Sequence, residues 1–239
     1  MVELIGPLIG TVVGGAISAT VAFLLAKQNN RTIEARDAKQ RKQLQKSALL
    51  KLQMRASILA SDVASTMRAI DQMLNEANEA GRSGWPKHAR IKPIVGNHEK
   101  VSFPIEEMEP LIEAKEFDIV QDLVELSMRH EAFVQAISTY SNLRLDLKNK
   151  VTITSVEGSV FGASLNDHEL KQLKPYLVEL EALIEHALSM GRSLETQAKA
   201  TITKIGPAAR KHLKDQSFPH LTWADDPHQD IIQESTKLL

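Results

Sequence analysis

The side chains best suited to metal chemistry gather near the carboxyl end of the sequence, where histidine and aspartate residues lie close together. Imidazole nitrogens and carboxylate oxygens are common ligands of divalent metal ions. These residues follow no recognised ligand spacing, and an aspartate followed by Pro227 is equally typical of a turn. We therefore expect a turn here, with no metal site and no cofactor. The residues concerned are His220, Asp225, Asp226, His228 and Asp230.

A second pair that could do chemistry is Arg82 and His88, with five residues between them. A closely spaced arginine and histidine at the start of a helix form the catalytic pair of some small helical ribonucleases. Here Gly84 and Pro86 fall between the two residues and predict a loop. Because a catalytic pair needs rigid support to hold its geometry, we do not expect a nuclease.

His130 is the third candidate, and it occupies one position of an apolar stripe between Glu116 and Lys148. This placement predicts a buried neutral imidazole that is hydrogen-bonded to a backbone carbonyl or a facing carboxylate. A pH-sensitive switch or a general base is the alternative. The sequence contains no phosphate-binding glycine loop, no paired-histidine zinc motif and no serine nucleophile elbow. We therefore predict that the chain is not an enzyme and has no catalytic residues.

The first element that the sequence predicts is a helix over the uncharged run from Leu4 to Ala26. At about 1.5 Å of rise per residue, such a helix can cross a hydrocarbon core of about 30 Å. A cleaved signal peptide is disfavoured, because the start of the chain carries no positive charge and no small-residue cleavage motif precedes Lys27. We expect a retained, single-pass transmembrane anchor.

Small residues recur at every fourth position of this run and form one stripe along the helix. Such a stripe lets the backbones of two membrane helices approach closely, so it predicts self-association into a homo-oligomer. The residues of the stripe are Gly6, Gly10, Gly14, Ser18 and Ala22, followed by Ala26.

The segment after the run is strongly basic, with nine lysines and arginines but only two acidic residues between positions 27 and 56. Positive charge next to a span predicts the cytoplasmic side, so we expect the bacterial inner membrane, the amino terminus outside and the remaining chain in the cytoplasm. Lys27, Arg31 and Arg36 are expected to contact anionic lipid headgroups. The overall net charge of −1 and the lack of aromatics within the segment argue against nucleic-acid binding.

The remaining sequence predicts an all-α fold, because aromatic residues make up only 4% of the chain and helix-forming residues dominate. We expect an anchor over residues 1–26, a basic juxtamembrane stalk over 27–48, an antiparallel helical bundle over 49–214 and a tail over 215–239. The tail should hold a short helix from about His228. Three apolar stripes predict the core, and the first could equally form a coiled coil between copies. The stripes comprise Leu49, Leu52, Ala56, Leu59, Val63, Met67, Ile70, Leu74 and Ala77; Ile119, Leu123, Leu126, His130, Phe133, Ile137 and Tyr140; and Leu173, Leu177, Leu180, Ile184, Ala187, Gly191, Leu194 and Ala198.

Two loops should interrupt the bundle, at residues 81–104 and 149–166. The first is unusually long, and its Trp85, Ile94 and Val95 are candidates for docking a protein partner, unless they pin the loop to the bundle. A short helix should open near Pro110. In the second loop, residues 151–155 and 159–161 could pair as a hairpin, and the helix that follows should stop at Gly206-Pro207.

These features favour a membrane-anchored scaffold that forms homo-oligomers, contacts membrane lipid and binds a protein partner through its cytoplasmic bundle. The alternative is a pore-forming or membrane-disrupting effector of a stress or anti-phage response, held in check by the bundle.

Overall fold

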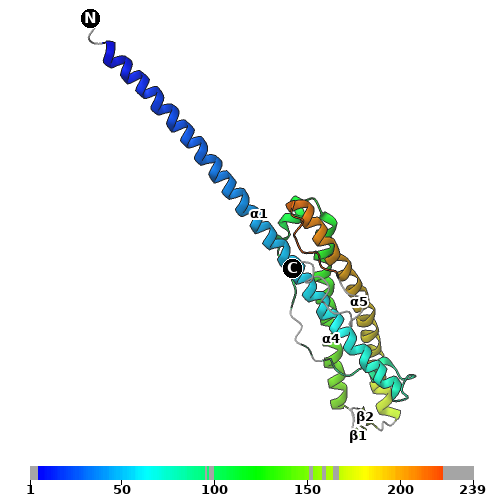
Figure 1. Ribbon diagram of the computed structural model, residues 1–239. Coiled ribbons are helices and arrows are strands. Elements are labelled where there is room, and N and C mark those ends of the chain that lie inside the picture. The colour runs from blue at the N-terminus through cyan, green and yellow to red at the C-terminus, as the bar shows by residue number, and fades with distance from the viewer. Residues whose placement is uncertain are drawn as a thin grey trace. The chain divides into compact units, whose positions relative to one another are not determined.

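The computed structural model describes the backbone of residues 5–94, 96, 100–150, 153–157, 160–163 and 167–222, and their side chains except those of 5–20 and 148–163. Five helices and one two-stranded hairpin make up this part of the chain (Figure 1), so the predicted all-α class is confirmed. The elements are α1 (Ile5–Glu79), α2 (Lys87–Arg90), α3 (Ile105–Glu113), α4 (Phe117–Lys150), β1 (Ile153–Glu157), β2 (Val160–Ala163) and α5 (Asp167–Leu213).

The chain divides into two units, Met1–Ser47 and Ala48–Leu239. In the first unit, the described residues belong to α1 alone, and every described side chain from Val21 to Leu44 is exposed. The second unit holds the core described below.

The three predicted apolar stripes are buried in the second unit, with Leu74 and Leu177 only partly so. The stripe of α1 therefore lines the core of this chain's own bundle, which answers the choice between bundle and intermolecular coiled coil for residues 49–77. Gly191 of α5 lies where three helices meet: a methyl group on it would come within 2.5 Å of Met67 Sδ in α1 and 2.8 Å of Phe133 Cε2 in α4. The absence of a side chain thus allows these helices to pack closely.

The direction of α4 differs from the prediction of an antiparallel bundle, because α1 and α4 run parallel. Asp62 of α1 contacts His130 of α4, and further along both helices Met67 and Phe133 both lie next to Gly191. For two long helices to run parallel, the chain between them must travel back along the bundle. Residues 80–104, which we call the crossover segment, make this return.

The crossover segment runs along α4 in the direction opposite to the helix, as its hydrogen bonds to α4 show. The Tyr140 hydroxyl donates to the carbonyl of Ile91, whereas the Ser127 hydroxyl, more than three turns earlier in α4, donates to the carbonyl of Val101. The length of the predicted loop is therefore explained by topology: it spans the bundle from the end of α1 to the start of α3.

Helix α5 runs antiparallel to α4, as predicted. Three interactions establish this direction, because the residue numbers rise from Glu116, just before α4, while those of the partners fall along α5. They join Glu116 to Lys211, Asp122 to Lys204 and Arg129 to Gln197.

Two predicted helix ends are wrong. The short third helix begins at Ile105 rather than near Pro110, because Pro104 precedes it in an extended conformation and two glutamates in its first turn favour a helix amino terminus. Helix α5 continues through Gly206-Pro207 to Leu213. Residues on both sides of Pro207 are buried, Ile205 and Ala209 among them, so packing outweighs the helix-breaking tendency of proline.

The hairpin is confirmed with shifted bounds. Strands β1 and β2 pair antiparallel, and Glu157 faces Val160 at the turn. The first expected strand, 151–155, begins two residues before β1, and the second, 159–161, begins one residue before β2. The turn residues lie outside the described part of the chain.

Candidate functional site

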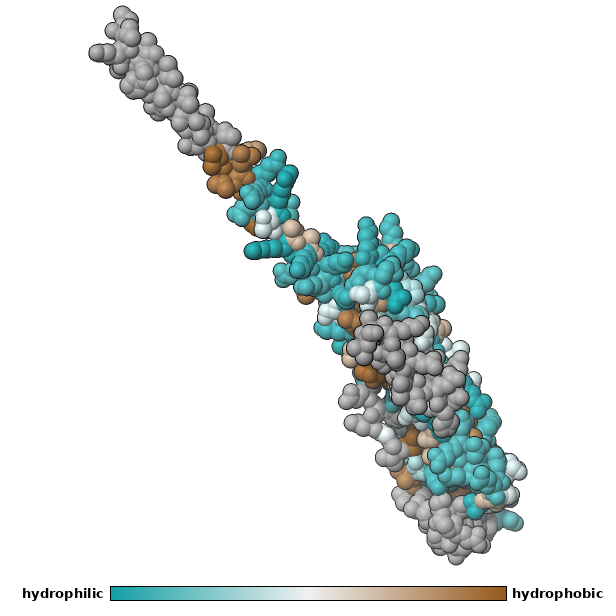
Figure 2. Space-filling view, viewed as in Figure 1, coloured by the Kyte–Doolittle hydropathy of each residue, from teal (hydrophilic) through white to brown (hydrophobic). Residues whose placement is uncertain are grey.

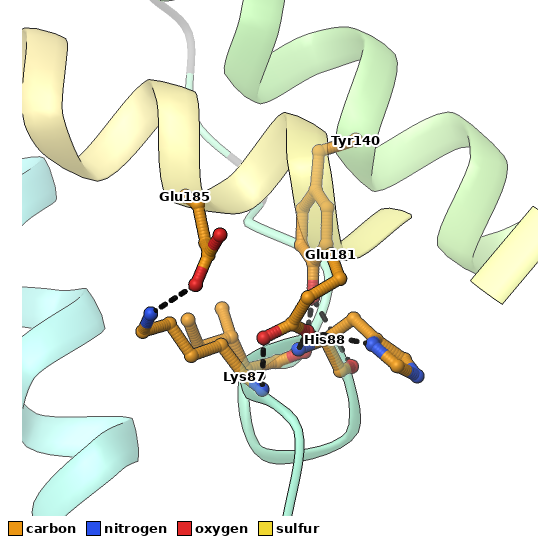
Figure 3. Close-up of polar contacts among 6 residues, drawn as sticks. Lys87, His88, Tyr140, Glu181 and Glu185 are labelled. Carbon is orange, nitrogen blue, oxygen red and sulfur yellow. Dashed lines mark hydrogen bonds and ion pairs between the residues drawn. The ribbon is translucent and has the colours of Figure 1, made fainter. Parts of the chain in front are cut away.

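A polar cluster lies where the start of the crossover segment meets α4 and α5 (Figure 3). It combines charged and hydrogen-bonding side chains from three segments that are far apart in the sequence. Its members are Lys87, His88, Tyr140, Glu181 and Glu185.

Glu181 caps the amino terminus of α2 from another helix. Its Oε1 accepts the backbone N–H of Lys87 at 3.0 Å, and its Oε2 accepts the backbone N–H of His88 at 2.9 Å. The first N–H groups of a helix lack partners within the helix, and Pro86, the residue before α2, provides no side-chain cap. The carboxylate of Glu181 replaces the missing cap.

Three hydrogen bonds to one carboxylate decide its protonation state. Burial raises the pKa of Glu181, but the N–H groups of His88 and Lys87 and the His88 side chain together outweigh burial, so the pKa lies below its usual range. Glu181 is therefore ionised at neutral pH. An ionised carboxylate only accepts hydrogen bonds, so we assign a proton to His88 Nδ1, which lies 2.7 Å from Glu181 Oε2.

Tyr140 fixes the next turn of the crossover segment. The side chain is fully buried, and its hydroxyl donates to the carbonyl of Ile91 at 2.7 Å and lies 3.3 Å from that of His88. Burial raises the pKa of Tyr140 above its ordinary value despite the nearby Arg144. The phenol thus serves as a neutral donor. Beside it, the Ser141 hydroxyl accepts the N–H of Ile94 and donates to its carbonyl.

The cluster is completed by an ion pair of 2.6 Å between Lys87 Nζ and Glu185 Oε1. Both carboxylate oxygens of Glu181 and the Tyr140 hydroxyl are bound to other groups of the same chain, and these hydrogen bonds hold α2 against α4 and α5. The arrangement is that of a structural clamp, which fixes the start of the crossover segment. Within the residues that the structure describes, no group of three His, Cys, Asp or Glu side chains could hold a metal ion.

The two described residues of the candidate docking set are placed differently. Ile94 packs against the core and is tied to Ser141, so it pins the crossover segment to the bundle. Trp85 is 49% exposed, and the guanidinium carbon of Arg82 lies 5.7 Å from the centroid of its ring. This distance permits a cation–π contact. Val95 lies outside the described residues.

Arg82 and His88 therefore have separate contacts, since Arg82 contacts Trp85 whereas His88 contacts Glu181. Sequence reasoning missed Glu181, which is 93 residues away from His88 along the chain. The sequence before α2 holds one signal: no Ser, Thr, Asp or Asn stands there to cap the helix, so a capping group had to come from elsewhere in the chain.

The predicted burial of His130 is confirmed, and its partner is a carboxylate from the facing helix. The side chain is 1% exposed, and Nε2 lies 2.9 Å from Oδ2 of Asp62. This pair joins α4 to α1. The alternative role as a pH-sensitive switch stays a prediction.

The side chains of Gly6, Gly10, Gly14 and Ser18 lie outside the described part of the chain, whereas Ala22 is exposed on α1. Figure 2 shows a brown band of hydrophobic residues on this helix, followed by teal, hydrophilic ones. The band includes the exposed Val21, Phe23, Leu24 and Leu25; Lys27, Arg31 and Arg36 follow and are exposed too.

In the part of the chain that is described, we find no helix with a stretch of sufficient length and hydrophobicity to cross a lipid bilayer. The described residues therefore do not support the predicted transmembrane span, which stays a prediction.

The histidine and aspartate cluster of the tail is described only at its first member. His220 packs over Gly206 of α5, where a methyl group would come within 2.9 Å of its Nδ1. Nearby, Phe218 is buried and its carbonyl accepts a hydrogen bond from Arg210. Asp225, Asp226, His228 and Asp230, and the predicted helix from about His228, lie outside the described residues.

Comparisons of the chain with family models, with curated proteins and with solved structures found no match.

Proposed function

We propose that the chain is a membrane-anchored scaffold, whose amino-terminal segment inserts in the bacterial inner membrane and whose helical bundle binds a protein partner in the cytoplasm. The observation that carries the proposal is the uncharged run from Leu4 to Ala26 at the start of a helix that continues to Glu79. A run of this length and composition is typical of a membrane span, and the basic residues after it favour a cytoplasmic bundle.

The basic residues nearest to the run supply the contact with lipid. Lys27, Arg31 and Arg36 are all exposed, and each positive charge close to an anionic leaflet contributes about 1 kcal/mol of attraction. The small-residue stripe from Gly6 to Ala22 supports self-association in the bilayer.

The exposed Trp85 beside Arg82 supports a binding role for the bundle. The polar cluster around Glu181 is satisfied by contacts within the chain, whereas Trp85 is exposed beside Arg82. Tryptophan and arginine are the residues most often found at the energetic centres of protein interfaces. Trp85 is therefore the proposed docking residue.

Membrane fractionation tests the anchor. The full chain should stay with bacterial membranes after an alkaline carbonate wash, whereas a variant lacking residues 1–26 should be released. Orientation can be read by single cysteines, because the chain has none. Ser47→Cys should react with a membrane-impermeant maleimide only after the cells are opened, and Val2→Cys should react in spheroplasts. Release of the full chain by carbonate would contradict the proposal.

The second candidate, a pore-forming effector, is favoured by the same stripe of small residues, since it would let several helices crowd around one axis. The only polar side chains in the run are Thr11, Ser18 and Thr20, so a lumen would be narrow and mostly apolar. Release of a trapped dye from liposomes that contain the full chain would favour the effector. Intact liposomes at high protein density would favour the scaffold.

A further inference from the structure

The last part of the described chain folds back along α5. Lys214, the residue after α5, has a φ of 49°, a left-handed conformation that turns the chain. Beyond this turn, the carbonyl of Phe218 accepts a hydrogen bond of 2.8 Å from Arg210, and His220 packs over Gly206. Residue numbers thus rise in the tail while they fall in α5, so the tail runs antiparallel to the helix.

Gly206 lies on the side of α5 that faces α1. Gly191 and Arg192 are next to Met67 and Asp71 of α1, and Gly206 follows them by about four turns of 3.6 residues. Residues that are four turns apart share one side of a helix. This part of the tail therefore lies on the α1 side of α5.

The tail meets α1 near Leu52. Helices α1 and α5 run antiparallel, because α1 is parallel to α4 and α4 is antiparallel to α5. Met67 of α1 is level with Gly191, and Gly206 stands fifteen residues further along α5. The level of Gly206 on α1 is therefore about fifteen residues before Met67.

At this level α1 has an exposed surface, which we call the α1 patch and which is formed by Lys51, Met54 and Ile58. The side chains of Met54 and Ile58 stand one turn apart and are 62% and 54% exposed. Lys51, one turn before Met54, is exposed too. The patch is thus an apolar pair with a positive charge beside it.

The charged neighbours of the α1 patch on the same helix already have partners. Arg55 Nε lies 2.9 Å from Glu107 Oε2, and Asp62 Oδ2 lies 2.9 Å from His130 Nε2. Lys51 forms no ion pair within the described residues. Its charge is therefore the one that a covering segment would have to match.

We propose that the residues directly after Thr222, from Trp223 to Asp226, cover the α1 patch. Four extended residues span up to about 14 Å, which is enough to cross a helix about 10–12 Å wide. Trp223 would place a large apolar surface on Met54 and Ile58, and methionine sulfur makes favourable contacts with aromatic rings. The segment would thus act as a strap that ties the end of α5 to α1.

The charge of this segment suits the patch better than the charge of other occupants. Asp225 and Asp226 follow Trp223 closely, so their carboxylates can meet the ammonium group of Lys51. The same patch of a second copy would bring another Lys51 and no carboxylate. An anionic lipid surface would attract Lys51 but repel the two aspartates of the adjoining tail. The contact lies within the second unit, so it does not depend on the membrane anchor.

Disulfide trapping tests the contact without background, because the chain contains no cysteine. Ile58→Cys is combined with Ala224→Cys in the full-length chain, which is oxidised mildly and separated without reductant. Val124→Cys combined with Ala224→Cys is the matched control. Val124 is also apolar and 44% exposed, and it lies at nearly the same level of the bundle, because α4 runs parallel to α1 and His130 contacts Asp62.

We expect the Ile58 pair to form an intrachain disulfide several-fold faster than the Val124 pair, because the bond needs the two Cβ atoms within about 4.5 Å of each other. Lys51→Glu should slow this reaction by repelling the aspartates of the tail, whereas Lys51→Arg should leave it nearly unchanged. Equal rates for the two pairs would overturn the strap, and so would disulfide-linked dimers of the Ile58 pair.

Tryptophan emission gives a second measurement that needs no cysteine. Trp85→Phe leaves Trp223 as the single tryptophan, because the chain contains two. In this background Ile58→Asp should shift the emission to longer wavelength by releasing Trp223 into water, whereas Val124→Asp should not. Both positions are exposed, so neither substitution should change the far-UV circular dichroism. Emission that does not respond to Ile58→Asp, or that shifts to shorter wavelength only after anionic liposomes are added, would contradict the strap.

Discussion

Gly191→Ala is the sharpest test of the packing between α1, α4 and α5. The added methyl group would stand 2.5 Å from Met67 Sδ and 2.8 Å from Phe133 Cε2, and both distances are too short for carbon and sulfur atoms in contact. The Met67 side chain can turn aside, but the Phe133 ring is fully buried and has little room to move. Overpacking of a core typically costs about 1–3 kcal/mol.

The substitution also has a favourable part, since alanine in a helix is about 1 kcal/mol better than glycine. We therefore expect a net loss of up to about 2 kcal/mol in the free energy of unfolding. For a domain of this size, that corresponds to a melting temperature lower by up to about 8 °C. Thermal and denaturant unfolding of the full chain, followed by far-UV circular dichroism, would measure it.

Two controls make the interpretation specific. Gly84→Ala adds a methyl group where no atom lies within 4 Å, so it should leave stability nearly unchanged. Met67→Ala removes one of the two clashing side chains, so the cost of Gly191→Ala should shrink in that background. A Gly191→Ala variant more stable than the parent by about 1 kcal/mol would refute the three-helix contact, because the gain in helix propensity would then be unopposed.

Two further predictions concern the clamp on the crossover segment. Glu181→Gln keeps the shape but offers one acceptor oxygen for three N–H groups, and it should lower the free energy of unfolding by about 1–3 kcal/mol, whereas Gln at the exposed Glu179 should not. Because the pKa of Glu181 is lowered in the folded state, its contribution to stability is present above the unfolded pKa of about 4.3 and is lost as the pH falls through the folded value. Chemical denaturation from pH 6 to about pH 3 should therefore show a smaller loss of unfolding free energy in Glu181→Gln than in the parent. Parallel curves for the two proteins would contradict the assignment. Tyr140→Phe leaves the buried carbonyl of Ile91 without its donor and should cost about 1–2 kcal/mol in the same assay, with increased proteolytic cleavage between Ile91 and Pro104; an unchanged cleavage rate would show that Tyr140 does not hold this segment.

The apolar faces of the three long helices could be predicted from the sequence, because burial follows a period that the sequence displays directly. Leu49 to Ala77, Ile119 to Tyr140 and Leu173 to Ala198 illustrate this, and His130 was correctly placed among them. The direction of α4 could not be predicted, since a periodic stripe shows which face is buried but not which way the helix runs.

The clamp was also beyond prediction from sequence. Glu181 is one of several glutamates on α5, and its role depends on the N–H groups of Lys87 and His88, which reach it only after the chain has folded. The continuation of α5 beyond Pro207 shows the same limit. Local preference favours a stop there, and only the packing of Ile205 and Ala209 reveals why the helix persists.

The parallel course of α1 and α4 has a consequence for the order of folding. Helices α4 and α5 are joined by a short hairpin and can pair early, because the chain between them closes a small loop. The apolar stripe of α1 leaves the ribosome first but finds its cover only after α4 and α5 have been made. Synthesis therefore passes through a stage in which Leu49 to Ala77 is uncovered, and chaperone binding during translation should concentrate on this stretch.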